Sequence, residues 1–267
     1  MPNYLALVDQ DTVAVAWLKA IKALSDNSNR AFNLIYSINK PSTLTKLDEK
    51  IIRKFDLFAK DHSLHPSNTV ANTIFPLDTF LSNRSDGFYE YYLDNILPKV
   101  RKQWGTYFER MIRRKNDDGT FMVGKDGAIL NPLDSLLKKV KNRLKGSGTT
   151  THYEMALDDA LLDLATFDPH HDGNYQVGGP CLSHLSFKVD NSGVLRLTAL
   201  YRSHWYVARA LGNLIGLARL QAFVAMETGA TVGPLTIVAS EAVLDVTGKN
   251  RTAAQTRQMF AECAALI

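Results

Sequence analysis

The segment 178–213, GGPCLSHLSFKVDNSGVLRLTALYRSHWYVARALGN, decides how this chain folds. Apolar residues alternate over 181–189 and again over 194–201, which predicts two strands. The DNSG between them has the composition of a hairpin turn. Apolar residues at helical spacing over 205–227 then predict a helix, which Gly229 ends.

Outside that segment the chain alternates between helical and strand-like stretches, without an internal repeat. Strand-like runs occur at 31–38 and 234–239. Helical spacing or helix-start signals mark 11–23, 45–61, 87–114 and 131–145. Helices packed on a hairpin and a further strand predict an α+β fold, with a mixed sheet packed against helices, in a single domain over 1–267.

Composition limits the classes of function. Of 267 residues, 45% are hydrophobic and 22% are charged, as in soluble globular proteins. The net charge of +4 falls short of a nucleic-acid signal, and no apolar run approaches the roughly 18 residues of a membrane span. The N-terminus lacks the basic region of a signal peptide, and Cys181 and Cys263 are too few for a disulfide framework. We expect a cytoplasmic protein with free thiols and no membrane or nucleic-acid partner.

Polar groups in the segment 178–213 could meet on one small anionic ligand. Cys181 opens the first strand, Arg202 and Ser203 end the second, and Asn213 lies in the helix. A nearby cation favours the nucleophilic thiolate, while Arg and Ser together can hold a phosphate. A carboxamide offers a donor and an acceptor that match N3–H and O4 of uracil. The pattern is therefore typical of a pyrimidine-nucleotide site.

Each of these residues also has a purely structural explanation. A lone cysteine in a strand, such as Cys181, is most often a small buried hydrophobe. Arg202 and Ser203 could form a solvated strand end, and Asn213 could make a helix-capping or core hydrogen bond. The sequence leaves both interpretations open for all four positions.

Histidines offer rival partners for the thiol. Strict strand alternation places His184 on the face opposite Cys181, together with Leu182, which argues against a direct Cys–His pair. His170 and His171 fall in a predicted loop and could supply a base or metal ligands. A solvated loop is the more common role of such a run, so no metal site is predicted.

At these positions the chain resembles the folate-dependent thymidylate synthases and the related deoxypyrimidine hydroxymethylases. The resemblance extends from about residue 131 onward. It is carried by the hairpin and by the pairs Pro180 and Cys181, Arg202 and Ser203, and Gly212 and Asn213. It implies a thymidylate synthase-like mixed sheet and a homodimer that packs through the face of that sheet.

The resemblance also implies a covalent mechanism. Cys181 would attack C6 of the pyrimidine, and C5 would then take a one-carbon unit from 5,10-methylenetetrahydrofolate to give a methyl or hydroxymethyl group. Arg202 and Ser203 would hold the phosphate, Arg202 would help activate Cys181, and Asn213 would read the uracil edge. The partner molecule would be a pyrimidine nucleotide.

Fainter matches in the resemblance involve four aromatic or amide residues. Trp104 and Tyr107 resemble the family's Tyr-Gly segment and are expected beside the substrate. Asn72 and Trp205 are expected beside the folate cofactor.

Several groups that the family uses are absent at the matching positions. The run ANTIF at 71–75 has no acid, and 146–152 has no adjacent arginines. Leu182 replaces a His, Trp205 replaces an Asp, and a His-x-Tyr motif is missing near Val243 and Asp245. Three hypotheses follow: a divergent one-carbon transferase, a nucleotide-binding homologue that acts as a sensor or assembly subunit, and, more weakly, a cysteine hydrolase.

Overall fold

The structure is a computed structural model that describes residues 4–83, 87–100, 107–116, 118–147, 153–156 and 181–267. Its centre is a mixed sheet with the strand order β1–β2–β7–β5–β4–β3, in which β6 also pairs with β7. β7 runs antiparallel to β2 and parallel to β5, so strands from both ends of the chain share one sheet. The strands are β1 (Leu5–Ala6), β2 (Arg30–Ile38), β3 (Glu154–Ala156), β4 (Leu182–Val189), β5 (Val194–Tyr201), β6 (His204–Trp205) and β7 (Thr231–Val243).

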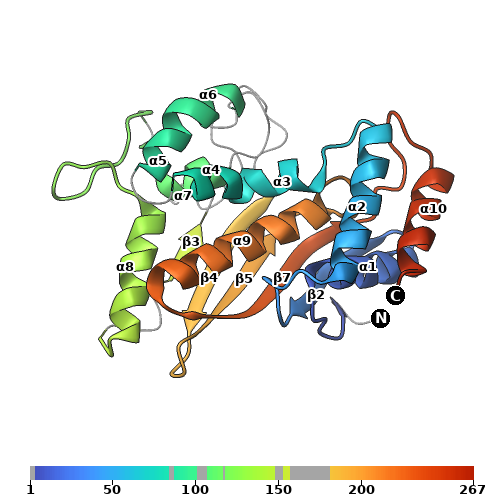
Figure 1. Cartoon of the computed structure of the whole chain (residues 1–267), viewed down its shortest axis with the longest axis horizontal. Coiled ribbons are helices and arrows are strands. Elements are labelled where there is room, and N and C mark those ends of the chain that lie inside the picture. The colour runs from blue at the N-terminus through green and yellow to red at the C-terminus, as the bar shows by residue number, and fades with distance from the viewer. Residues whose placement is uncertain (1–3, 84–86, 101–106, 117, 148–152, 157–180) are drawn as a thin grey trace.

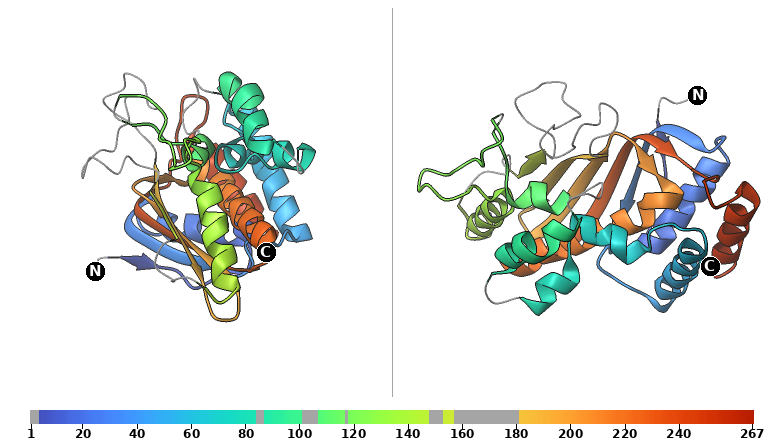
Figure 2. Two further views of the ribbon diagram at one scale, coloured as in Figure 1. Left: turned by 90° about the vertical axis from the view of Figure 1, so that its left-hand side faces the viewer. Right: turned by 90° about the horizontal axis from the view of Figure 1, so that it is seen from above.

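Helices pack against one face of the sheet (Figures 1 and 2). α9 (Leu211–Thr228) lies along that face, and α3 (Ser67–Ile74) packs on the side of α9 away from the sheet. The other helical elements are α1 (Val13–Ser25), α2 (Lys46–Asp61), α4 (Leu77–Ser82), α5 (Phe88–Tyr91), the π-helical turn η1 (Tyr92–Ile96), α6 (Leu97–Val100), α7 (Tyr107–Ile112), α8 (Pro132–Leu144), the π-helical turn η2 (Tyr206–Ala210) and α10 (Ala253–Ala264). The fold is therefore mixed α and β, with an open mixed sheet packed against helices.

None of the helices in the described ranges combines the length and the apolar character that crossing a membrane requires.

The predicted hairpin is present, but one detail of its first strand is wrong. β4 and β5 pair antiparallel, and the carboxylate of Asp190 accepts backbone hydrogen bonds from Ser192 and Val194 at 3.0 Å, which fixes the turn. A bulge between Leu182 and His184 shifts the register. Because a bulge adds one residue to the strand, strict alternation fails there, and Leu182 is buried in the core instead of sharing the exposed face of His184.

The predicted helix over 205–227 begins differently. β6 first continues along β7 in the register of β5, since Tyr201 pairs with Ala239 and His204 with Ala242. The helix then starts as η2, whose Val207 N–H donates to Oδ1 of Asp245 at 2.8 Å. The group that satisfies the helix start therefore lies far along the chain, where no local capping signal could reveal it.

Two glycines let α3 and α9 approach closely. A Cβ added at Gly212 would lie 2.4 Å from Cβ of Val70, and one at Gly216 would lie 2.7 Å from the carbonyl oxygen of Ala71. α9 is consequently enclosed by the sheet on one side and by α3 on part of the other, which explains why most of its residues are buried. Gly212, one of the residues that carry the family resemblance, thus has a packing role.

Candidate functional site

The backbone of Cys181 is held from two directions. Its carbonyl oxygen accepts a hydrogen bond from the Arg202 N–H at 2.9 Å, which extends the β4–β5 pairing by one step. The phenol oxygen of Tyr107, on α7, accepts the N–H of Cys181 at 3.3 Å and that of Leu182 at 3.5 Å. The hairpin therefore brings Cys181 and Arg202 together as the sequence suggests, and Tyr107 lies beside them as a backbone anchor.

Two arginines act on the Cys181 thiol. Burial raises the pKa of Cys181 above its ordinary value, and the positive charges of Arg202 and Arg209 oppose that increase. Burial is the larger effect, so the thiol is protonated at neutral pH. Cations do lie near the sulfur, but they do not by themselves produce the thiolate expected from the sequence. A reacting Cys181 must therefore lose its proton to another group.

Arg209 and His65 belong to this neighbourhood, although neither was predicted from the sequence. Arg209 lies in η2, four residues before Asn213, a spacing that places two side chains on one helix face. Burial lowers the pKa of His65, and the charge of Arg209 lowers it further. Since Arg209 acts on both His65 and Cys181, the segment before α3 lies close to the hairpin end. The four-residue spacing between Arg209 and Asn213 was the available signal.

Asn213 is buried against His204. Its Nδ2 lies 3.3 Å from Nε2 of His204, whose ring stacks on Tyr201 with the ring centroids 4.0 Å apart. Burial lowers the pKa of His204 to about 3, so the ring is neutral and Nε2 can accept a hydrogen bond from the amide. The structural explanation is therefore correct for the amide nitrogen of Asn213, which makes a core hydrogen bond. Within the described residues its amide oxygen has no hydrogen-bond partner.

Two buried polar atoms near Asn213 are unsatisfied. Oη of Tyr201 and Nδ1 of His204 have no hydrogen-bond partner within the part of the chain that the structure describes. Burial raises the pKa of Tyr201, and the nearby Tyr107 and Cys181 raise it further, so these atoms border the Cys181 site. Most buried polar groups in native proteins are paired, and unpaired ones commonly indicate bound water or a polar ligand.

Within the described residues, no hydrogen bond joins Cys181 to the remaining predicted site residues. Ser203 is half-buried at the bend between β5 and β6. Trp205 lies on β6 with 51% of its surface exposed. Asn72, on α3, accepts a hydrogen bond from Nη1 of Arg219 at 3.2 Å. Trp104 lies outside the described residues.

The structure shows no histidine of the described residues bonded to the thiol. Nε2 of His184 lies 2.8 Å from Oε2 of Glu154 on β3, so His184 contacts a carboxylate and not Cys181. His170 and His171 lie outside the described residues. Within the described ranges, no three or more His, Cys, Asp or Glu side chains gather as a metal site would require.

Asp245, which lies where the resemblance would place a His-x-Tyr motif, has a structural role. Both side chains of the ion pair between Asp245 and Arg251 are 7% exposed, and Nη2 of Arg251 lies 2.7 Å from Oδ2 of Asp245. Burial raises the pKa of Asp245, while the backbone N–H of Val207 and the charge of Arg251 oppose that increase. Asp245 therefore holds the start of η2, and with it Arg209, in place.

No model of a known protein family matches the chain, and a comparison with curated proteins found no match.

Proposed function

We propose that the chain binds a pyrimidine nucleotide, with uracil as the base, and transfers a one-carbon unit to C5 through a covalent adduct between Cys181 and C6. The observation that carries this proposal is the pairing of the hairpin end, where the backbones of Cys181 and Arg202 are hydrogen-bonded at 2.9 Å and the charges of Arg202 and Arg209 both act on the thiol. A thiol beside two guanidinium groups suits a substrate that carries both an electrophilic ring and a phosphate.

Each residue has one role in this proposal. The Cys181 thiol gives its proton to solvent water, the sulfur forms the bond to C6, and the electron pair of the C5–C6 double bond moves towards C5 and O4. After the one-carbon unit is attached, C5 loses its proton, and the sulfur leaves C6 as the double bond is restored. Arg202, Arg209 and Ser203 bind the phosphate. The amide oxygen of Asn213 accepts N3–H, and its second amide proton is donated to O4. His204 keeps that amide in place through the 3.3 Å contact.

The proposed cofactor is 5,10-methylenetetrahydrofolate, which when bound would supply the one-carbon unit and, for a methyl product, the hydride. Trp205 fits a folate, because about half of its surface (51%) is exposed and offers a face for stacking an aromatic ring. Asn72 fits less well, because its amide oxygen is already bound to Arg219 at 3.2 Å. Trp205 is therefore the residue that we assign to the cofactor.

The test uses a nucleotide of 5-fluorouracil and intact-protein mass spectrometry. With cofactor present, the wild-type protein should gain the mass of the nucleotide plus that of the attached cofactor, because C5 carries fluorine and has no proton to lose, and Cys181→Ser should not. Cys263→Ser is the matched control, because burial raises the pKa of Cys263 to about 11 and its thiol should not compete. An unchanged adduct in Cys181→Ser would refute the assignment of the nucleophile.

A second candidate function is nucleotide binding without turnover. It is favoured by the raised pKa of Cys181 and by Asn72, an amide where the resemblance leads one to expect an acid. In that case a uracil nucleotide would raise the melting temperature of both the wild type and Cys181→Ser, and a C5-tritiated nucleotide would release no tritium. Turnover without any folate would instead favour the cysteine hydrolase.

We also propose that two copies associate through the open face of the sheet. Ile35, Val238 and Leu200 lie side by side across three neighbouring strands, and each remains partly exposed. Burying such an apolar row would stabilise a two-fold dimer. Val238→Lys should then reduce the sedimentation coefficient from that of a dimer to that of a monomer.

A further inference from the structure

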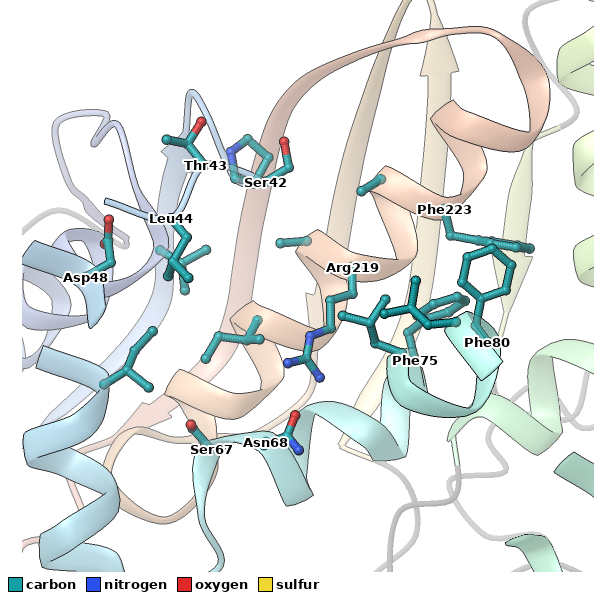
Figure 3. Close-up of a pocket in the computed structure, with 18 of the residues that line it drawn as sticks. Ser42, Thr43, Leu44, Asp48, Ser67, Asn68, Phe75, Phe80, Arg219 and Phe223 are labelled. Carbon is teal, nitrogen blue, oxygen red and sulfur yellow. The ribbon is translucent and has the colours of Figure 1, made fainter. Parts of the chain in front are cut away.

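A groove of about 600 Å³ lies along the side of α9 that faces α2, α3 and α4 (Figure 3). None of Cys181, Arg202, Ser203 or Asn213 lines it. The stripe that α9 contributes has helical spacing and includes Ile215, Arg219, Ala222 and Met226. A volume of this size lies within the range of about 300–1,000 Å³ that is typical of small-molecule sites.

One end of the groove is aromatic. The rings of Phe75 and Phe223 have centroids 4.9 Å apart, and those of Phe80 and Phe223 are 5.1 Å apart. Figure 3 shows these three side chains grouped at one side of the groove. Leu81 and Met226 also line the groove and are 46% and 50% exposed, so part of the apolar lining is uncovered. This end suits the hydrocarbon or aromatic body of a ligand.

Arg219 places a cation next to that apolar end. In Figure 3 its guanidinium extends from α9 towards Asn68 on α3. Burial lowers the pKa of Arg219, and Asp78 opposes this decrease from beyond ion-pair distance. The hydrogen bond to Asn72 at 3.2 Å uses one of its five donors, and no carboxylate of the described residues pairs with it. Partly buried guanidinium groups usually have an anionic partner.

The carboxylates at the other end limit the charge of the ligand. Asp48 accepts backbone hydrogen bonds from Thr45 at 2.9 Å and from Ala14 at 3.3 Å, and Asp56 accepts one from Ser67 at 2.7 Å. Both are therefore held at helix N-termini as acceptors. Against a single guanidinium, two such carboxylates would repel a second negative charge on the ligand.

We propose that this groove binds an amphipathic monocarboxylate, with the carboxylate on Arg219 and the apolar body on Leu81 and Met226, above the buried cluster of Phe75, Phe80 and Phe223. The proposal does not depend on the nucleotide function, since it uses none of the residues around Cys181.

The test is isothermal titration calorimetry with octanoate, octanol and octyl phosphate. The wild type should bind octanoate at least about tenfold more tightly than octanol, because a charge-assisted hydrogen bond to Arg219 distinguishes them. Octyl phosphate, which is largely dianionic, should bind more weakly than octanoate. Arg219→Met keeps the volume of the side chain but removes the charge, and it should make the affinities for octanoate and octanol equal.

Two further variants locate the site. Ala222→Phe fills the groove and should abolish binding of both ligands. Arg257→Met removes an exposed arginine on α10, outside the groove, and should leave the affinity for octanoate at the wild-type value. No binding of octanoate to the wild type, equal binding of octanoate and octanol, or unchanged binding of octanoate by Arg219→Met would each overturn the proposal. The mass-spectrometric adduct at Cys181 tests the nucleotide function separately.

Discussion

The start and the middle of α9 present polar side chains in two different ways. At the start, Asn213 is 4% exposed and its amide is fixed by His204. In the middle, Arg219 is half-buried and extends into a groove of about 600 Å³. A covalent step needs groups that are already oriented, whereas binding an apolar molecule needs space. The two proposals therefore use different features of one helix: a fixed amide at its start and open space beside its middle.

The largest expected effect concerns the buried histidine that orients Asn213. The folded-state pKa of His204 is about 3, against 6.5 for an ordinary histidine, because burial disfavours the charged ring. Between these pH values the unfolded state binds more protons than the folded state. Stability is therefore fully present above pH 6.5 and is lost as the pH falls towards 3, by on the order of 5 kcal/mol.

Replacing His204 should remove this part of the pH dependence. As the pH falls from 7 to 4, the wild type should lose more unfolding free energy than His204→Phe. Urea denaturation at each pH measures this difference. Ser203→Ala, which changes the neighbouring residue and removes no titratable group, is the control and should retain the wild-type slope. A difference that does not change with pH would show that His204 is not buried in its neutral form.

The second prediction compares packing at the two positions of α9. Gly212→Ala places a Cβ 2.4 Å from Cβ of Val70 and 2.7 Å from the carbonyl oxygen of Ser67, so α3 must move away. We expect a loss of about 3 kcal/mol in unfolding free energy, typical of an overpacked core. The reciprocal change Ala222→Gly, on the groove side, should cost about 1 kcal/mol, the usual loss of helix propensity. Equal losses in denaturation experiments would contradict the close crossing of α3 and α9.

Sequence patterns were sufficient for the parts of the site that depend on local structure. Alternation and a turn signal predict the hairpin, and the hairpin alone brings Cys181 to Arg202. The pairing of His204 with Asn213 could not be predicted in the same way, because a histidine between Ser203 and an exposed Trp205 resembles a solvated strand end. It is buried because β6 continues along β7.

Other parts depend on contacts that no local pattern encodes. Asp245 holds the start of η2 from more than thirty residues away, which places Arg209 near Cys181. The groove around Arg219 is assembled from α1, the run 41–44, α2, α3, α4 and α9, so it exists only once these elements pack. The resemblance gave no indication of it, since the groove shares no residue with the pairs at 180–181, 202–203 and 212–213 that carry the resemblance.

The smallest expected effect tests whether Arg209 belongs to the Cys181 site. Its positive charge opposes the increase that burial causes in the pKa of Cys181, so Arg209→Met should raise that pKa further. In a Cys263→Ser background, alkylation of Cys181 by iodoacetamide should then be slower at pH 8, by about threefold at low salt, because Arg209 is exposed and its charge is screened. Raising the salt concentration should shrink the difference between the two proteins.

Arg196→Met is the matched control, because that arginine pairs with Asp190 at the hairpin turn, at 3.2 Å, and does not act on the thiol. If Arg209→Met and Arg196→Met give the same pH–rate profile, Arg209 has no part in the site, and the start of α9 contributes Asn213 alone.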